Sequence, residues 1–287
     1  ADSNDCTDEY IGRAANRNAH GNANSIANSS TNSYFYANYL CAAIVIATIP
    51  VDASPKAIAF DPGTNRAFVA LFDDSSVAVI DTKTNQHLAT WNTRSRGHAN
   101  GIAFANNRLF VSLRDSASVA VLDATTGALV GNVSVGGMPY GIGVANNRTW
   151  VANFAARSVS VLDATTRTVL AMTTIGDFPA FVIADNNRAF VSYYGGGVAV
   201  IGSDGAFQNR FAPLGGGTFG MAFNATTNNL YVANRDQRQL WVINPATGQI
   251  IKGIALPKAP SAMTINSITN RLYVVLADTN QVDVRDG

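Results

Sequence analysis

The sequence predicts an all-β fold, a six-bladed β-propeller that is preceded by an N-terminal arm. Three observations predict this fold. A unit of about 41 residues occurs six times, each unit reads as four short strands, and the strand that the last unit lacks is found before the first unit. A chain of 287 residues can form one such domain, because repeat folds often exceed about 200 residues.

The repeat is marked by an aromatic residue followed by valine, with arginine or asparagine two positions before the aromatic residue. Successive copies are separated by 42, 40, 40, 41 and 42 residues, a regularity that chance does not produce. The copies are 66–69, 108–111, 148–151, 188–191, 229–232 and 271–274.

Three further segments in each unit also read as strands, because they are short, rich in β-branched or aromatic residues, and bounded by turn residues. One lies upstream of the aromatic mark, as at 57–60, 101–104 and 141–144. One lies about eleven residues after it, at 77–80, 119–122, 159–162, 198–201, 240–243 and 282–284. The fourth follows, as at 129–135 and 250–256. Four strands per unit of this length are typical of a propeller blade.

The turn residues support this assignment. Asparagine pairs at 106–107, 146–147 and 186–187 precede three of the aromatic strands, and asparagine tolerates the positive φ that tight hairpins need. Asp81, Asp123 and Asp163 each end an alternating strand, where their carboxylates suit hydrogen bonds to turn amides. We interpret these aspartates as structural.

The sixth unit ends after its third strand, and residues 43–50 precede the first unit as residues 249–257 precede the sixth. We therefore expect residues 44–49 to pair beside residues 281–285 and close the ring, which removes exposed sheet edges. The propeller then spans 44–287 and the arm spans 1–43. A seventh-blade strand at 32–38 is the alternative, but too few residues follow it for two further strands.

The repeats resemble the YVTN family of β-propeller repeats. The resemblance is carried by Tyr231-Val232-Ala233-Asn234, by 79–85 and by 47–51, and it covers about 44–287. It implies bacterial or archaeal secreted or surface-layer-like proteins, with a minority of enzymes among similar propellers. Fold likeness alone does not assign a function.

The composition excludes several partners and chemistries. The net charge is +1 and no basic cluster occurs, which argues against nucleic acid, and no apolar run is long enough to span a membrane. Glu9 is the only glutamate, and the propeller contains two histidines, His87 and His98, and no cysteine. The sequence therefore predicts no His or Cys metal site in the propeller and no cofactor.

The N-terminal arm is rich in Asn, Ala and Ser, and it contains both cysteines, Cys6 and Cys41. A secreted chain, which the start at Ala1 without an initiator Met also suggests, would favour a disulfide. That bond could lie within one arm or join two chains; free thiols are the alternative. Because 12–33 has Ile26 as its only large apolar side chain, the arm needs a surface to order on. The expected anchors are Tyr34, Phe35, Tyr36, Tyr39 and Leu40.

Propeller sites usually lie at the channel mouth, on loops that connect blades and that join second to third strands. Residues repeated around the ring are more often scaffold, whereas His98 and 193–197 break the repeat. The candidate ligand-binding residues are His98, Asn100, Arg114, Tyr140, Asn153, Phe181, Tyr193, Asn234 and Arg235.

The sequence predicts a non-enzymatic, secreted or cell-surface interaction protein that self-associates through residues 1–43, into a finite oligomer or a filament. An arm folded over its own propeller is the alternative to a contact with a neighbour. A channel-mouth module that binds a sugar or a peptide is the second functional hypothesis. A lyase or hydrolase that uses His98 is the third, although no Gly-x-Ser-x-Gly turn occurs.

Overall fold

The computed structural model describes residues 48–52, 54–61, 63–185, 187–211, 214–266, 269–276 and 281–287. The chain divides into two units, 1–44 and 45–287, and every described strand belongs to the second unit. The predictions for the arm, for Cys6 and Cys41 and for the strand at 32–38 lie outside the described residues. Within the described ranges, no helix has the length and apolar character needed to cross a bilayer.

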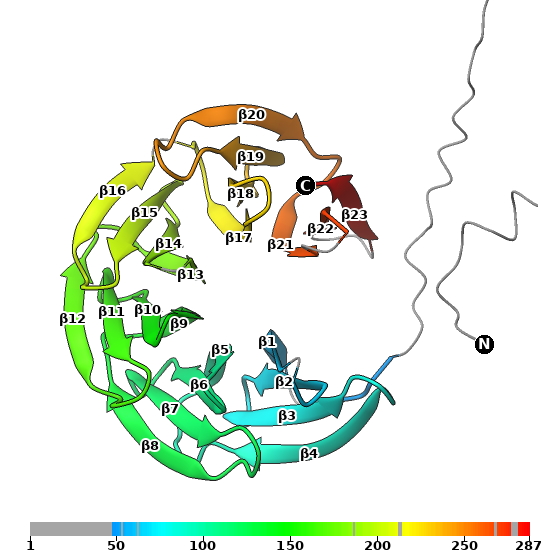
Figure 1. Cartoon of the computed structure of the whole chain (residues 1–287), viewed down its shortest axis with the longest axis vertical. Coiled ribbons are helices and arrows are strands. Elements are labelled where there is room, and N and C mark those ends of the chain that lie inside the picture. Colours follow the sequence, from blue (N-terminus) through cyan, green and yellow to red (C-terminus); the bar gives the residue numbers. More distant parts are fainter. Residues whose placement is uncertain are drawn as a thin grey trace, which may run out of the picture. The chain divides into compact units, whose positions relative to one another are not determined.

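The second unit is a six-bladed β-propeller, as predicted, and Figure 1 shows its sheets arranged around a central axis. Each blade is one antiparallel sheet in sequential strand order. Blade 1 contains β1 (Pro55–Asp61), β2 (Arg66–Leu71), β3 (Ser76–Asp81) and β4 (Gln86–Asn92). Blade 2 contains β5 (Ala99–Ala105), β6 (Arg108–Leu113), β7 (Ser118–Asp123) and β8 (Leu129–Ser134). Blade 3 contains β9 (Pro139–Ala145), β10 (Arg148–Asn153), β11 (Ser158–Asp163) and β12 (Val169–Thr174).

The remaining blades follow the same order. Blade 4 contains β13 (Pro179–Ala184), β14 (Arg188–Tyr193), β15 (Gly197–Gly202) and β16 (Phe207–Phe211). Blade 5 contains β17 (Thr218–Asn224), β18 (Asn229–Asn234), β19 (Gln239–Ile243) and β20 (Ile250–Ala255). The described part of blade 6 contains β21 (Pro260–Asn266), β22 (Arg271–Leu276) and β23 (Gln281–Asp286). The first strand of each blade is the innermost, and each aromatic-Val mark lies on the second strand.

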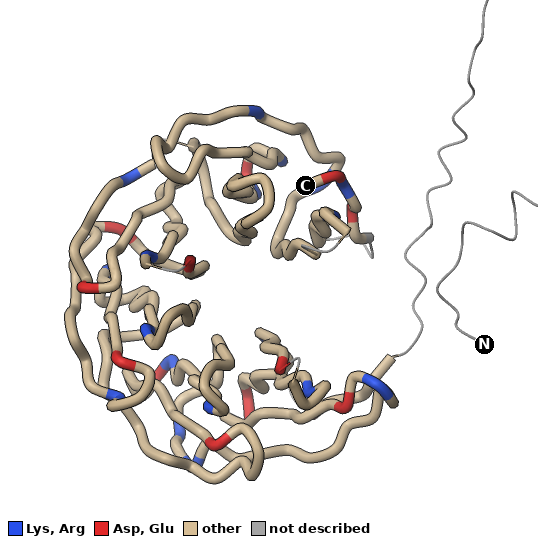
Figure 2. Tube along the Cα trace, in the orientation of Figure 1, with Lys and Arg blue, Asp and Glu red and all other residues tan. Residues whose placement is uncertain are grey.

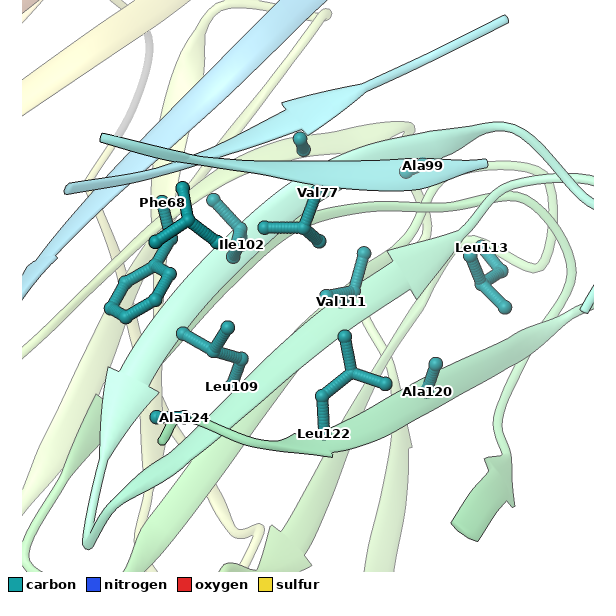
Figure 3. Packing of buried hydrophobic residues seen from close by; sticks show 12 residues of the cluster. Phe68, Val77, Ala99, Ile102, Leu109, Val111, Leu113, Ala120, Leu122 and Ala124 are labelled. Carbon is teal, nitrogen blue, oxygen red and sulfur yellow. The ribbon is translucent and has the colours of Figure 1, made fainter. Parts of the chain in front are cut away.

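The core lies between blades. In blades 1 to 4 the second and third strands are almost entirely buried, and apolar clusters fill the spaces between successive blades. Figure 3 shows the cluster between blades 1 and 2, where Phe68 and Val77 meet Leu109, Val111 and Leu122. Four further clusters join the blades pairwise from blade 2 to blade 6.

Blades 6 and 1 do not make the contact that the other neighbours make. Inner strands of successive blades lie side by side from β1 and β5 through to β17 and β21, and Figure 1 shows the ribbon open between β21 and β1. Val275 and Val282 of blade 6 are 41% and 44% exposed, whereas the equivalent Ala70 and Val77 of blade 1 are fully buried. The described residues therefore leave one seam in the ring.

The residues that precede β1 pack on blade 1. Ile49 and Val51 cover a buried cluster that includes Val69 and Leu71, on the side of blade 1 that would face blade 6. Ile254 and Leu256, at the end of β20, occupy the equivalent places on blade 6. Of the predicted closing strand 44–49, residues 44–47 lie outside the described residues, and Thr48 and Ile49 are not in a strand.

The turn chemistry follows the prediction at two of the three asparagine pairs, and the third pair includes Asn186, which lies outside the described residues. Both residues of the pairs Asn106-Asn107 and Asn146-Asn147 have positive φ, between 42° and 59°. The carboxylate of Asp123 accepts hydrogen bonds from the amides of Thr125 and Thr126, each at 3.0 Å. Asp81 and Asp163 accept the equivalent pairs of amides.

Those turn amides lower the pKa of all three aspartates below the ordinary value of 3.8. The leading causes are the amides of Thr84, Thr126 and Thr166, respectively. Figure 2 shows that charged residues of both signs are thinly spread around the blades, without a large region of one sign.

Candidate ligand-binding site

A cavity of about 440 Å³ opens at one end of the central axis, where the inner strands begin and the second strands end. These positions coincide because the two strands are antiparallel, as the pairing of Pro55 with Leu71 illustrates. Five blades contribute to the lining, so the cavity belongs to the ring as a whole. The lining residues are Lys56, Ala57, Phe72, Asn100, Gly101, Ile102, Arg114, Tyr140, Gly141, Ile142, Ala180, Phe181, Val182, Tyr194 and Phe219.

Aromatic rings in mutual contact run along one side of the cavity, from blade 3 to blade 5. Tyr140 stacks on Phe154 with ring centroids 4.9 Å apart, and Phe154 meets Tyr194 edge-on at 5.4 Å. Tyr194 then contacts Phe219 at 5.2 Å, and Phe219 lies 6.3 Å from Phe181. We call these five residues the aromatic arc. Offset and edge-on contacts of this kind hold rings in fixed relative positions.

The strand pattern explains why these rings face the mouth. The last residue of the second strand is buried in blades 1 to 5, and the next residue lies outside the strand, in the turn at the mouth. Every described blade except the sixth has a large side chain at this next position, and these are Phe72, Arg114, Phe154, Tyr194 and Arg235.

Two buried serines fix the backbone of the arc. The hydroxyl of Ser112 donates to the carbonyl oxygen of Tyr140 at 2.6 Å, across the junction of blades 2 and 3. The hydroxyl of Ser192 donates to the carbonyl oxygen of Phe219 at 3.0 Å, across the junction of blades 4 and 5. Both serines are fully buried, so each bond is protected from water.

Phe181 breaks the symmetry of the ring. The other five blades have alanine or glycine at its position, namely Ala57, Gly101, Gly141, Gly220 and Ala262. A small residue is needed there because neighbouring inner strands approach closely: a Cβ on Gly141 would lie 2.4 Å from the carbonyl oxygen of Ala180. Blade 4 instead places a phenyl ring, 37% exposed, at the cavity.

Cations flank the arc. Lys56 Nζ lies 5.2 Å from the Phe72 ring centroid, and the Arg114 guanidinium lies 5.8 Å from the same centroid. At the far end, the Arg235 guanidinium lies 5.4 Å from the Phe219 ring. All three distances are within the range of cation–π attraction.

The structure brings four of the predicted residues to the cavity: Asn100, Arg114, Tyr140 and Phe181. Arg235 lies at its edge, over Phe219. Three others, Asn153, Tyr193 and Asn234, are buried away from it.

The buried three stabilise the blades. The Asn153 amide donates to the hydroxyls of Ser158 and Ser160, and the Asn234 amide donates to the carbonyl oxygen of Leu214. Tyr193 packs in the core between blades 3 and 4, and burial raises the pKa of its phenol.

His98 lies beside a different, polar cavity between blades 1 and 2. Its ring stacks on Phe72 with centroids 4.6 Å apart, and its Nδ1 contacts an Asp115 carboxylate oxygen. The His98 ring therefore has one stacking partner and one carboxylate partner, both from the same chain. Among the described residues, no group of three or more His, Cys, Asp or Glu side chains could hold a metal ion.

Sequence reasoning missed Phe72 and Phe154. It selected Asn153, Tyr193 and Asn234, which end the second strands, one residue short of the side chains that face the mouth. The signal was present in the repeat, since the position after each second strand is large in five successive copies.

Comparison with known proteins supports the fold alone. No protein-family model matches the chain, and no curated protein matches its sequence. The chain is similar to the WD40 β-propeller domain of Doa1, with a TM-score of 0.70 and 12% sequence identity. The match covers 82% of this chain and 79% of that one.

Proposed function

We propose that this chain is a non-enzymatic binding propeller whose channel mouth holds a ring-bearing ligand against the aromatic arc. The observation that carries the proposal is Phe181, the one large side chain at a position where five other blades have alanine or glycine. Inner strands pack with alanine or glycine at this position in the other five blades, so close packing of these strands does not itself require the phenyl ring. It does add an exposed apolar face to a cavity that is already lined by Tyr140, Tyr194 and Phe219.

The chemistry of the lining supports binding. A cavity of about 440 Å³ is within the usual size of small-molecule sites, which are mostly apolar with a few placed polar groups. The aromatic arc supplies flat faces for stacking, while Lys56, Asn100 and Arg114 supply the polar contacts. A peptide with an aromatic side chain, or a sugar that carries an aromatic group, fits this description. The resemblance to YVTN repeats supports a secreted or cell-surface location, where such ligands are abundant.

The test is saturation-transfer NMR with two probes, phenyl β-glucoside and an amidated tyrosine dipeptide. We expect one of them to bind, and Tyr194→Ala to weaken that binding about tenfold, since a buried aromatic contact commonly contributes more than 1 kcal/mol. Phe207→Ala is the matched control, because Phe207 lies on the outer strand β16 and is 45% exposed, against 44% for Tyr194. Equal weakening by both variants, or binding of neither probe, contradicts the proposal.

A second function, self-association through residues 1–43, is favoured by the outer rim. The fourth strands lie at the free edge of their sheets, and several bear exposed large apolar side chains. These are Leu88, Val169, Leu170, Met172, Phe207, Ile250 and Ile251. Apolar edge strands readily pair with another extended chain, and the arm supplies Tyr34, Phe35, Tyr36, Tyr39 and Leu40 as anchors.

A further inference from the structure

We infer that the ligand of the mouth cavity carries a carboxylate on a flat apolar body, an inference that rests on the binding function proposed above. The relevant class is an aromatic carboxylate, whose ring stacks on the aromatic arc and whose charge lies at Lys56 and Arg114.

The charge of the lining is one-sided. Lys56 and Arg114 line the cavity, and no Asp or Glu does so among the described residues. Among the described residues, Lys56 also has no ion-pair partner. Arg114 Nε is buried without a hydrogen-bond partner, and its approach to Asp115 Oδ1 is a loose 3.9 Å. A buried donor without a partner is costly, and a ligand carboxylate that draws the Arg114 guanidinium toward the cavity would relieve that cost.

The two cations share one aromatic neighbour, Phe72. Both are within 6 Å of the Phe72 ring centroid, so they approach the same end of the cavity from blades 1 and 2. A guanidinium and an ammonium at one end of a cavity match a planar carboxylate. The guanidinium offers hydrogen-bond donors in a fixed plane, and the ammonium adds a positive charge on a flexible side chain.

The remaining surface selects the body of the ligand. The aliphatic part of the lining comes from Ile102, Ile142 and Val182, and beyond the two cations its side-chain polar groups are Asn100 and the phenol oxygens of Tyr140 and Tyr194. A fully hydroxylated sugar would leave most of its hydroxyls without partners against such a surface. A flat aromatic ring stacks on the arc without that penalty.

The test uses three probes with the full chain: 1-naphthoate, the uncharged 1-naphthalenemethanol, and acetate, which has the charge without the ring. We expect calorimetry to give naphthoate an affinity at least tenfold higher than that of the alcohol, and no measurable binding of acetate. Lys56→Gln should reduce the preference for naphthoate severalfold, as should raising the salt concentration, because the charges are partly exposed. Lys252→Gln removes the same charge from the outer strand β20 and should leave the preference unchanged.

The outcomes separate this inference from the function on which it rests. Equal affinity for naphthoate and the alcohol, or a preference that Lys56→Gln and Arg114→Gln both leave intact, overturns the carboxylate inference and leaves the binding function standing. Absence of binding by both naphthalene probes overturns the inference, and it also counts against the aromatic arc as a binding surface. Unfolding temperatures within a few degrees of the wild type show that the variants are folded.

Discussion

The rings of Tyr140 and Phe154 stack at 4.9 Å, with an interplanar angle of 24°, at the mouth of blade 3. Tyr140 is the second residue of β9, and Phe154 directly follows the end of β10. The antiparallel pairing of these strands brings the two positions to one end of the blade. The first contact of the aromatic arc therefore follows from strand register within a single repeat.

Close packing of the inner strands predicts a position-specific cost. Gly141→Val should lower the free energy of unfolding by about 1–3 kcal/mol, because its Cβ would lie 2.4 Å from the carbonyl oxygen of Ala180 and 2.8 Å from the Phe181 Cα. Gly131→Val is the control, since a Cβ on Gly131 meets nothing within 4 Å. Denaturant unfolding measures both variants, and equal stability of the two would show that the inner strands are not in contact.

The Asp turns predict acid sensitivity. Hydrogen bonds from the Thr126 and Thr125 amides lower the pKa of Asp123 below 3.8, with a smaller contribution from Arg108. The carboxylate thus stabilises the fold above the unfolded-state pKa, and this contribution is lost as pH falls through the folded-state pKa. Asp123→Asn should therefore flatten the loss of stability below about pH 4.

Blade 5 offers the matched control for this effect. Asn244 occupies the equivalent turn and accepts the amides of Ala246 and Thr247 through its neutral side chain. Asn244→Asp should steepen the acid dependence where Asp123→Asn flattens it. Thermal unfolding between pH 2.5 and 6 measures both, and parallel pH profiles for the two variants would contradict the turn assignment.

Ring closure predicts a specific crosslink. If residues 44–49 complete blade 6 as β20 completes blade 5, Thr48 lies opposite Asp283, as Gly253 lies opposite Trp241. Thr48→Cys with Asp283→Cys, with Cys6 and Cys41 replaced by serine, should form an intramolecular disulfide. Thr48→Cys with Lys252→Cys should not. Non-reducing mass analysis decides, and crosslinked dimers would mean that the strand is donated between chains.

Self-association through the arm predicts a change of mass. Deletion of residues 1–40, which retains the expected closing strand, should reduce the assembly to monomers in light scattering and remove any filaments from electron micrographs. Replacement of Tyr34, Phe35 and Tyr36 by serine should have the same effect in the full-length chain, because buried aromatic anchors dominate interface energetics. An unchanged assembly state in both variants would make the arm a cover for its own propeller.

Because His98 stacks on Phe72 and contacts Asp115, we expect that it is not required for ligand binding or for any catalytic activity. His98→Ala should alter ligand affinity or any measured activity by no more than a few-fold, since His98 lines the separate polar cavity and is not among the residues that line the mouth cavity. A loss of a hundredfold or more would support the hydrolase or lyase hypothesis, because removing a general acid or base typically costs about 10²–10⁴ in rate.

The repeat made the propeller predictable from sequence. Strand periodicity, the Asn pairs and the Asp turns are local signals, and all of them recur at fixed spacing. The site was less predictable, because it depends on the exact residue at which each second strand ends and the turn at the mouth begins. A shift of one residue separates the buried Asn153 from Phe154 in the arc. Contacts between blades, such as that of Ser112 with Tyr140, leave no local signal at all.

A crystal structure of the full chain with bound 1-naphthoate tests the central claim most directly. The account predicts that the naphthalene ring lies against the cavity face of the aromatic arc, in contact with Tyr140 or Tyr194, with its carboxylate within hydrogen-bonding distance of Lys56 Nζ or the Arg114 guanidinium. A naphthoate bound on the outer strands, or a mouth cavity that stays free of it at saturating concentration, would contradict the account.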